Sequence, residues 1–133
     1  MKTVCCRLHR GEDLLCAIRA LAQEHHLQAA VVLSAVGCVS HARLRDASGV
    51  TVRAIDEPCE IVSLTGTVSE ERIHLHISLS REDLTTLGGH LTEGCIINTT
   101  CELVLGELEG WRFGVEQDGE TGYDEIVFER RAL

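Results

Sequence analysis

The chain has 133 residues, 44% of them hydrophobic and one of them proline, which suits one compact domain over residues 1–133. Its formal net charge is −9 with the histidines neutral, which counts against a nucleic-acid binder that relies on a basic surface. No apolar run approaches the roughly 20 residues that span a bilayer, and no apolar segment typical of a signal peptide follows Lys2. We expect a cytoplasmic protein without a membrane partner.

The seven cysteines also favour a reducing compartment. Their number is odd, no Cys-x-x-Cys pair occurs, and most stand in apolar runs. This pattern is typical of small buried thiols and not of a disulfide framework.

The N-terminal third predicts a strand, a helix and a second, long apolar segment. A first strand is expected over Thr3 to Leu8. A helix opens at Gly11-Glu12-Asp13, carries an apolar stripe at helical spacing, and ends near His25-His26. The run from Ala29 to Val36 predicts a buried strand that breaks at Gly37.

The remaining chain predicts mostly strands. The strand broken at Gly37 resumes through Val39 to Arg45 and pairs with Val50 to Ile55 as a hairpin. Glu60 to Val68 is a strand in which Gly66 marks a bulge or a close backbone approach. Further strands are expected from Ile73, over Cys95 to Leu105, at Trp111 to Phe113 and over Tyr123 to Glu129, with residues 80–93 as a loop or short helix. The sum is an α+β fold: a mostly antiparallel sheet of seven to nine strands and one N-terminal amphipathic helix.

Three histidines in seventeen residues form the strongest chemical signal. Side chains alternate along a strand, so His74 and His76 share one face about 6.6 Å apart. The flexible pair Gly88-Gly89 would let His90 approach as a third ligand. Three imidazoles suit zinc or another divalent first-row metal, and leave a coordination position open for water or substrate. The alternative is a solvated pair of hydrogen-bonded histidines on a strand, with His90 capping a turn.

At these residues the sequence resembles the PPC (plants and prokaryotes conserved) domain, also called PCC. The motifs, in order, are Arg10-Gly11-Glu12-Asp13-Leu14, Ala35-Val36-Gly37, Glu60 to Gly66, His74 to Leu79, Gly88-Gly89-His90-Leu91, Gly94-Cys95, Thr100-Cys101-Glu102 and Thr121-Gly122-Tyr123. The resemblance implies an α+β homotrimer with a distant fold-level kinship to acetolactate decarboxylase. That enzyme holds zinc with three histidines, two of them in a His-x-His, so the analogy makes His74, His76 and His90 the ligands. A likeness of fold does not transfer the decarboxylase activity.

Many prokaryotic members of this family carry the label of DNA-binding protein, which is taken from plant members whose domain follows AT-hook motifs. An AT-hook needs an Arg-Gly-Arg-Pro core, and this chain has none.

Two functional hypotheses follow. The first is a metal-dependent enzyme or a small-molecule binder, with Glu102, Glu60 or Glu93 as candidate acid or base and with Arg10 or Arg43 as candidate anchors for an anionic substrate. The second is a trimeric regulatory or DNA-associated interaction module, for which the net charge is unfavourable.

Overall fold

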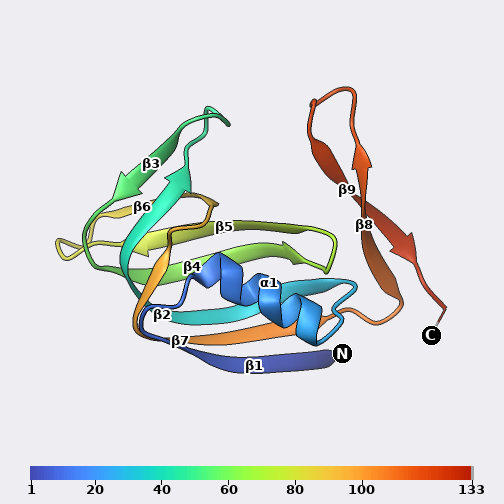
Figure 1. Ribbon diagram of the computed structural model, residues 1–133, viewed down its shortest axis with the longest axis horizontal. Helices are drawn as coiled ribbons and strands as arrows, with labels where there is room; N and C mark the ends of the chain where they lie inside the picture. The colour runs from blue at the N-terminus through green and yellow to red at the C-terminus, as the bar shows by residue number, and fades with distance from the viewer. Residues whose placement is uncertain (133) are drawn as a thin grey trace.

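The computed structural model describes residues 1–132 and contains, within them, one helix and nine strands. In chain order the elements are β1 (Lys2–His9), α1 (Leu14–Glu24), β2 (Ala30–Arg45), β3 (Val52–Ile55), β4 (Cys59–Val68), β5 (Ile73–Ser80), β6 (Thr86–Leu91), β7 (Ile96–Glu107), β8 (Trp111–Gln117) and β9 (Asp124–Arg130). Figure 1 shows α1 lying across one side of the main sheet, while β8 and β9 form a hairpin that stands apart from it.

The main sheet has seven strands in the order β1-β7-β2-β4-β5-β6, and β3 branches from the end of β2. Every pairing in it is antiparallel. Strand β6 also pairs with β2, so that β2, β4, β5 and β6 close on themselves as a small barrel. The predicted α+β fold with a mostly antiparallel sheet and one N-terminal helix is confirmed.

The helix begins and ends where its sequence predicts. Asp13 is the N-cap, and its carboxylate accepts hydrogen bonds from the backbone N–H of Cys16 (3.0 Å) and of Gly94 (2.7 Å). The second bond ties the start of the helix to the chain that follows β6. The helix ends at Glu24 with His25 as C-cap, and its buried stripe of Leu14, Ile18 and Ala22 faces the sheet.

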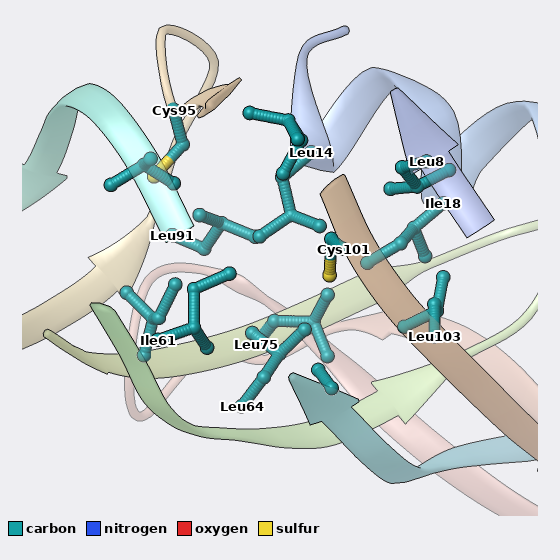
Figure 2. Packing of buried hydrophobic residues seen from close by; sticks show 14 of the residues in the cluster. Leu8, Leu14, Ile18, Ile61, Leu64, Leu75, Leu91, Cys95, Cys101 and Leu103 are labelled. Carbon is teal, nitrogen blue, oxygen red and sulfur yellow. The ribbon is translucent and has the colours of Figure 1, made fainter. Parts of the chain in front are cut away.

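The core lies between α1 and the concave face of the sheet, as Figure 2 shows. Leu14 and Ile18 of the helix join the same buried cluster as Leu103 of β7 and Leu75 of β5. Alternation along β5 directs Leu75, Ile77 and Leu79 into this cluster, where each is at most 3% exposed. The same alternation directs the histidines of β5 to the opposite, outer face.

Apart from shifts of a few residues at strand ends, the strands differ from the prediction at two places. Strand β2 is continuous through Gly37, with local irregularities in its register, because a Cβ at this position would lie 2.2 Å from the carbonyl oxygen of Thr100 and glycine avoids that clash. Residues 80–93, expected as a loop or short helix, contain β6, and Gly88-Gly89 lies inside this strand. At Gly88, a Cβ would lie 2.3 Å from the carbonyl oxygen of Ile77. At Gly89, it would lie 2.8 Å from the carbonyl oxygen of Arg45.

The cysteines are free throughout the described residues, but fewer are buried than their apolar neighbours suggest. Cys59, Cys95 and Cys101 are buried, while Cys5 and Cys16 are exposed on the outward sides of β1 and α1. Burial raises the pKa of Cys95 to about 12 and that of Cys101 to about 11, so both remain protonated, unreactive thiols at neutral pH.

Within the described part of the chain, no helix has the length and apolar character required to cross a membrane.

Candidate metal centre

The three predicted ligands come together on the outer face of the barrel. His74 and His76 both point outward from β5, and the register of β5 with β6 sets His90 directly opposite His76. The ring centroids are 5.0 Å apart for His74 and His76, 5.2 Å for His74 and His90, and 5.6 Å for His76 and His90. One nitrogen from each ring lies within 4.8 Å of the other two.

This arrangement fits a first-row metal ion after small side-chain adjustments. Zinc–nitrogen bonds of about 2.0–2.1 Å in a tetrahedral site set the nitrogens about 3.3 Å apart. Rotation of the rings therefore has to bring the nitrogens closer by at most about 1.5 Å. The Nδ1 atom of His90 is buried and has no hydrogen-bond partner within the described residues. A buried nitrogen without a partner is costly, and an ion bound to it would remove that cost.

The protonation state of the cluster also suits metal binding. Burial, followed by the positive charge of Arg45, lowers the pKa of His90 to about 4. Burial and the charge of Arg72 lower the pKa of His74. Both rings are therefore neutral at pH 7, which is the form that binds a metal.

A glycine allows the histidine strand to lie close to β4. Gly66 pairs with Leu75, between the two histidine positions, and has a φ angle of +142°. A Cβ at Gly66 would lie 1.9 Å from the carbonyl oxygen of His74. The predicted close backbone approach at Gly66 is confirmed, and it holds β5 in the position from which His74 and His76 point outward.

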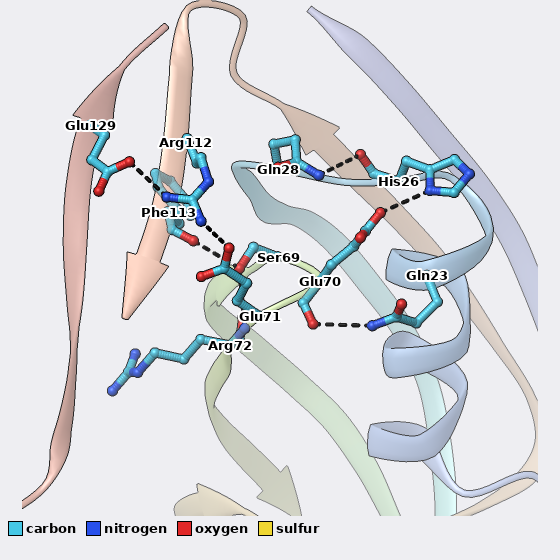
Figure 3. A network of polar contacts seen from close by, with 10 residues as sticks. All are labelled: Gln23, His26, Gln28, Ser69, Glu70, Glu71, Arg72, Arg112, Phe113 and Glu129. Atoms are coloured by element: carbon cyan, nitrogen blue, oxygen red, sulfur yellow. Dashed lines mark hydrogen bonds and ion pairs between the residues drawn. The ribbon is translucent and has the colours of Figure 1, made fainter. Parts of the chain in front are cut away.

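The turn between β4 and β5 is anchored on two sides, as Figure 3 shows. On the helix side, Gln23 donates a hydrogen bond to the carbonyl oxygen of Glu70 (3.0 Å). On the hairpin side, the buried Ser69 hydroxyl donates to the carbonyl oxygen of Phe113 (3.1 Å) and accepts from the backbone N–H of Arg72 (3.1 Å). These bonds fix the start of β5, and with it the place of Arg72.

Two arginines flank the histidines. Arg72 precedes His74 by two residues and contributes to its lowered pKa, and Arg45 of β2 pairs directly with His90 of β6. The sequence could have indicated Arg72, because the spacing Arg-x-His-x-His is that of residues on one face of a strand. No local pattern reveals Arg45, because it meets His90 through the closure of β6 onto β2.

A cleft of about 520 Å³ is lined by Arg45, the strand partner of His90, while the three histidines do not line it. It lies between the β2–β3 hairpin and β6, and its lining includes Arg45 and Gly88, which stands two residues before His90. Arg53 and Arg81 also line it, together with the acidic residues Asp46, Asp56 and Glu57. Arg81 forms an ion pair with Glu57 (3.3 Å).

The predicted acid or base residues do not lie at the cluster within one chain. Glu102 is on β7, which β2 and β4 separate from β5, so about 14 Å divides the two strands. Glu60 pairs with Ser80, four residues along β5 from His76 and so about 13 Å away. Glu93 forms an ion pair with Arg19 of the helix (3.1 Å).

The predicted anion anchors also lie elsewhere. Arg10 is exposed between β1 and α1, at the far side of the sheet from β5. Arg43 stands on β2, two residues from Arg45, but its side chain extends over Gly94, where a Cβ would lie 2.8 Å from the Arg43 Cδ atom. Within one chain, the arginines next to the histidines are therefore Arg45 and Arg72, and not the predicted Arg10 and Arg43.

The Plants and Prokaryotes Conserved (PCC) domain family matches residues 1–109. The chain belongs to this family. A hypothetical protein from Salmonella enterica is similar over nearly all of both chains, with 31% identity, a TM-score of 0.94, and coverage of 98% of this chain and 95% of the other.

Two further relatives of this PCC protein bear on its function. The metal-containing protein AF0104 from Archaeoglobus fulgidus is 29% identical with a TM-score of 0.80, over 96% of this chain and 94% of that one. The bifunctional protein GlmU of Synechococcus sp. (strain JA-2-3B'a(2-13)) is 41% identical over 120 residues, which are 90% of this chain and 19% of the relative. The chain thus spans about a fifth of the length of the curated relatives that it matches.

Proposed function

We propose that this PCC protein holds zinc, or another divalent first-row metal, with His74, His76 and His90, and binds or acts on a small molecule there. The observation that carries the proposal is that three imidazole side chains converge on one outer face, each with a nitrogen within 4.8 Å of the others. No cysteine or carboxylate belongs to this set within the described residues. Three protein ligands leave a coordination position open, which is the pattern of catalytic zinc sites.

The chemistry that such an ion supplies when bound is polarisation of a carbonyl oxygen, or a bound water with a pKa of about 7. The chain's own residues determine what reaches the ion. His74 and His90, whose pKa values are lowered, offer lone pairs at neutral pH. The description of the Archaeoglobus relative as metal-containing supports the proposal by likeness.

Equilibrium dialysis of chelator-treated protein against zinc tests the metal centre. We expect one ion per chain, and binding that weakens on acidification because protons compete for the imidazole nitrogens. Binding of the same strength and stoichiometry by His90→Ala would contradict the assignment.

We also propose that the chain assembles as a homotrimer in the cytoplasm, as the PCC resemblance implies. Exposed aliphatic side chains on adjacent strands support assembly, since Leu33 and Val36 of β2 and Val62 of β4 are each about half exposed (49%, 56% and 59%). The free cysteines suit a reducing compartment. Light scattering should give three times the chain mass of 14.6 kDa, whereas a monomer at micromolar concentration would refute the assembly.

The alternative role in DNA binding has no specific structural support. The chain is acidic, and Arg19, Arg81 and Arg112 are each paired with glutamates. We therefore expect no retardation of duplex DNA at low salt and micromolar protein. Retardation that declines steeply with salt would favour the alternative.

A further inference from the structure

The buried polar atoms without a partner are concentrated at one place. Within residues 1–132 they are the Nε atom of Arg45, the Nη1 atom of Arg72 and the Nδ1 atom of His90. Folded proteins satisfy most buried polar groups, so each exception requires an explanation. The metal centre accounts for the histidine, but it cannot account for two cations.

The two arginines belong to the histidine face. His74 and His76 point outward along β5, Arg72 directly precedes this strand, and Arg45 of β2 pairs with His90 of the neighbouring strand β6. Each guanidinium group thus belongs to a residue beside a histidine of the cluster, Arg45 through strand pairing with His90 and Arg72 through its place two residues before His74.

Their charges are poorly compensated. Arg72 donates to the carbonyl oxygen of Asp124 (3.3 Å) and has a long ion pair with Glu125 (3.8 Å), which leaves its Nη1 atom without a partner. Figure 3 shows its side chain extending away from the Glu71–Arg112 ion pair. Arg45 has no ion pair at all among the described residues.

We propose that Arg45 and Arg72 form an anion-binding site beside the three histidines, which takes the carboxylate or phosphate group of a small ligand. Arg45 is the principal anchor, since its unpaired Nε–H lies on the side of the guanidinium that can donate to two oxygens at once. The adjoining cleft of about 520 Å³ gives room for the rest of the ligand. The proposed ligand class extends the proposed metal-dependent function and rests on it. The anion site itself does not require the metal.

The test is a titration of inorganic phosphate and of acetate, at constant ionic strength set with chloride, into metal-free and zinc-loaded protein. Arg45→Ala is compared with Arg43→Ala, which removes the same charge two residues away on the same strand. Binding is measured by calorimetry and by the rise in melting temperature. Because charge-assisted bidentate bonds are lost, we expect a dissociation constant about 10- to 100-fold higher for Arg45→Ala, and little change for Arg43→Ala.

Arg45→Lys separates charge from geometry, and we expect it to recover only part of the affinity because an ammonium cannot grip two oxygens. The relative affinities of phosphate and acetate identify the preferred group. Equal binding by wild type, Arg45→Ala and Arg43→Ala, or no saturable binding of either anion in both metal states, overturns the proposal. If the wild-type protein binds the anions but not zinc, the metal centre is contradicted and the anion site is supported.

Discussion

The two faces of β5 have different tasks. Inward, Leu75, Ile77 and Leu79 are nearly inaccessible and join the hydrophobic core. Outward, His74 and His76 meet His90, next to buried polar atoms that have no partner. Adjacent residues of one strand thus serve stability on one side and recognition on the other, because side chains alternate along a strand.

Buried side chains behind the β4–β5 turn and on the histidine face differ in whether their hydrogen-bonding groups have partners. The buried Ser69 behind the β4–β5 turn has its hydroxyl fully engaged, whereas Arg45, Arg72 and His90 each leave a nitrogen unpaired. Such a concentration of unsatisfied groups on one face favours a binding site over a structural surface.

The largest expected difference in stability is between substitutions at two neighbouring residues of β5, Leu75 and His76. Leu75→Ala should reduce the free energy of unfolding by about 2–5 kcal/mol, since it opens a cavity in the core, while metal per folded chain stays unchanged. His76→Ala should change the stability of the metal-free protein by less than about 1 kcal/mol. Urea unfolding in chelator measures both, and a larger loss for His76→Ala would contradict the division of the strand.

Gly66→Ala tests the close approach that positions the histidines. Its methyl group would meet the carbonyl oxygen of His74, and its φ angle of +142° disfavours a side chain, so we expect a loss of about 2–4 kcal/mol. Gly119→Ala is the control, because nothing lies within 4 Å of its Cβ position. Similar melting temperatures for the two variants would show that β4 does not constrain β5.

Ser69→Ala should have a smaller effect. It leaves the carbonyl oxygen of Phe113 and the N–H of Arg72 without this partner, at a cost of about 1–3 kcal/mol. Ser34→Ala, at an exposed position of β2, should stay within about 0.5 kcal/mol of wild type. Equal unfolding midpoints for both variants would remove the anchoring role of Ser69.

The smallest effect is a pH dependence of the metal-free protein. The pKa of His90 is about 4 in the folded chain and about 6.5 in the unfolded chain, so the unfolded state binds more protons between these values. Stability from this group is therefore lost as the pH falls from about 6.5 to about 4. His90→Gln should lose less stability over this range than the control His9→Gln, and identical declines would contradict the shifted pKa.

The sequence predicted much of the fold and the pair His74 and His76 because these depend on local alternation, whereas His90 was predicted from the glycine pair before it and from the family resemblance. His74 and His76 stand two residues apart on a strongly alternating strand, and the helix carries both its cap and its apolar stripe. Strand β6 was missed because Gly88-Gly89 lacks the side chains that favour a strand. The glycines instead meet the backbones of β5 and β2, which no local pattern reveals.

The surroundings of the site depended on long-range register and were largely missed. Arg45 reaches the cluster only because β6 pairs with both β5 and β2, and Arg10 and Arg43 were predicted as anchors instead. Glu60 and Glu102 had suitable chemistry, but strand order separates them from the histidines within one chain. Local periodicity predicts the face of a residue, and topology determines its neighbours.

The most direct measurement is the metal content, by mass spectrometry, of protein purified without chelator. Wild type is compared with His76→Ala and with His9→Ala, which removes an exposed histidine on β1 outside the cluster. We predict close to one ion per chain in wild type and His9→Ala, and less than about 0.1 in His76→Ala, because two imidazoles alone hold zinc weakly. Equal metal in all three proteins, or none in wild type, would contradict the metal centre.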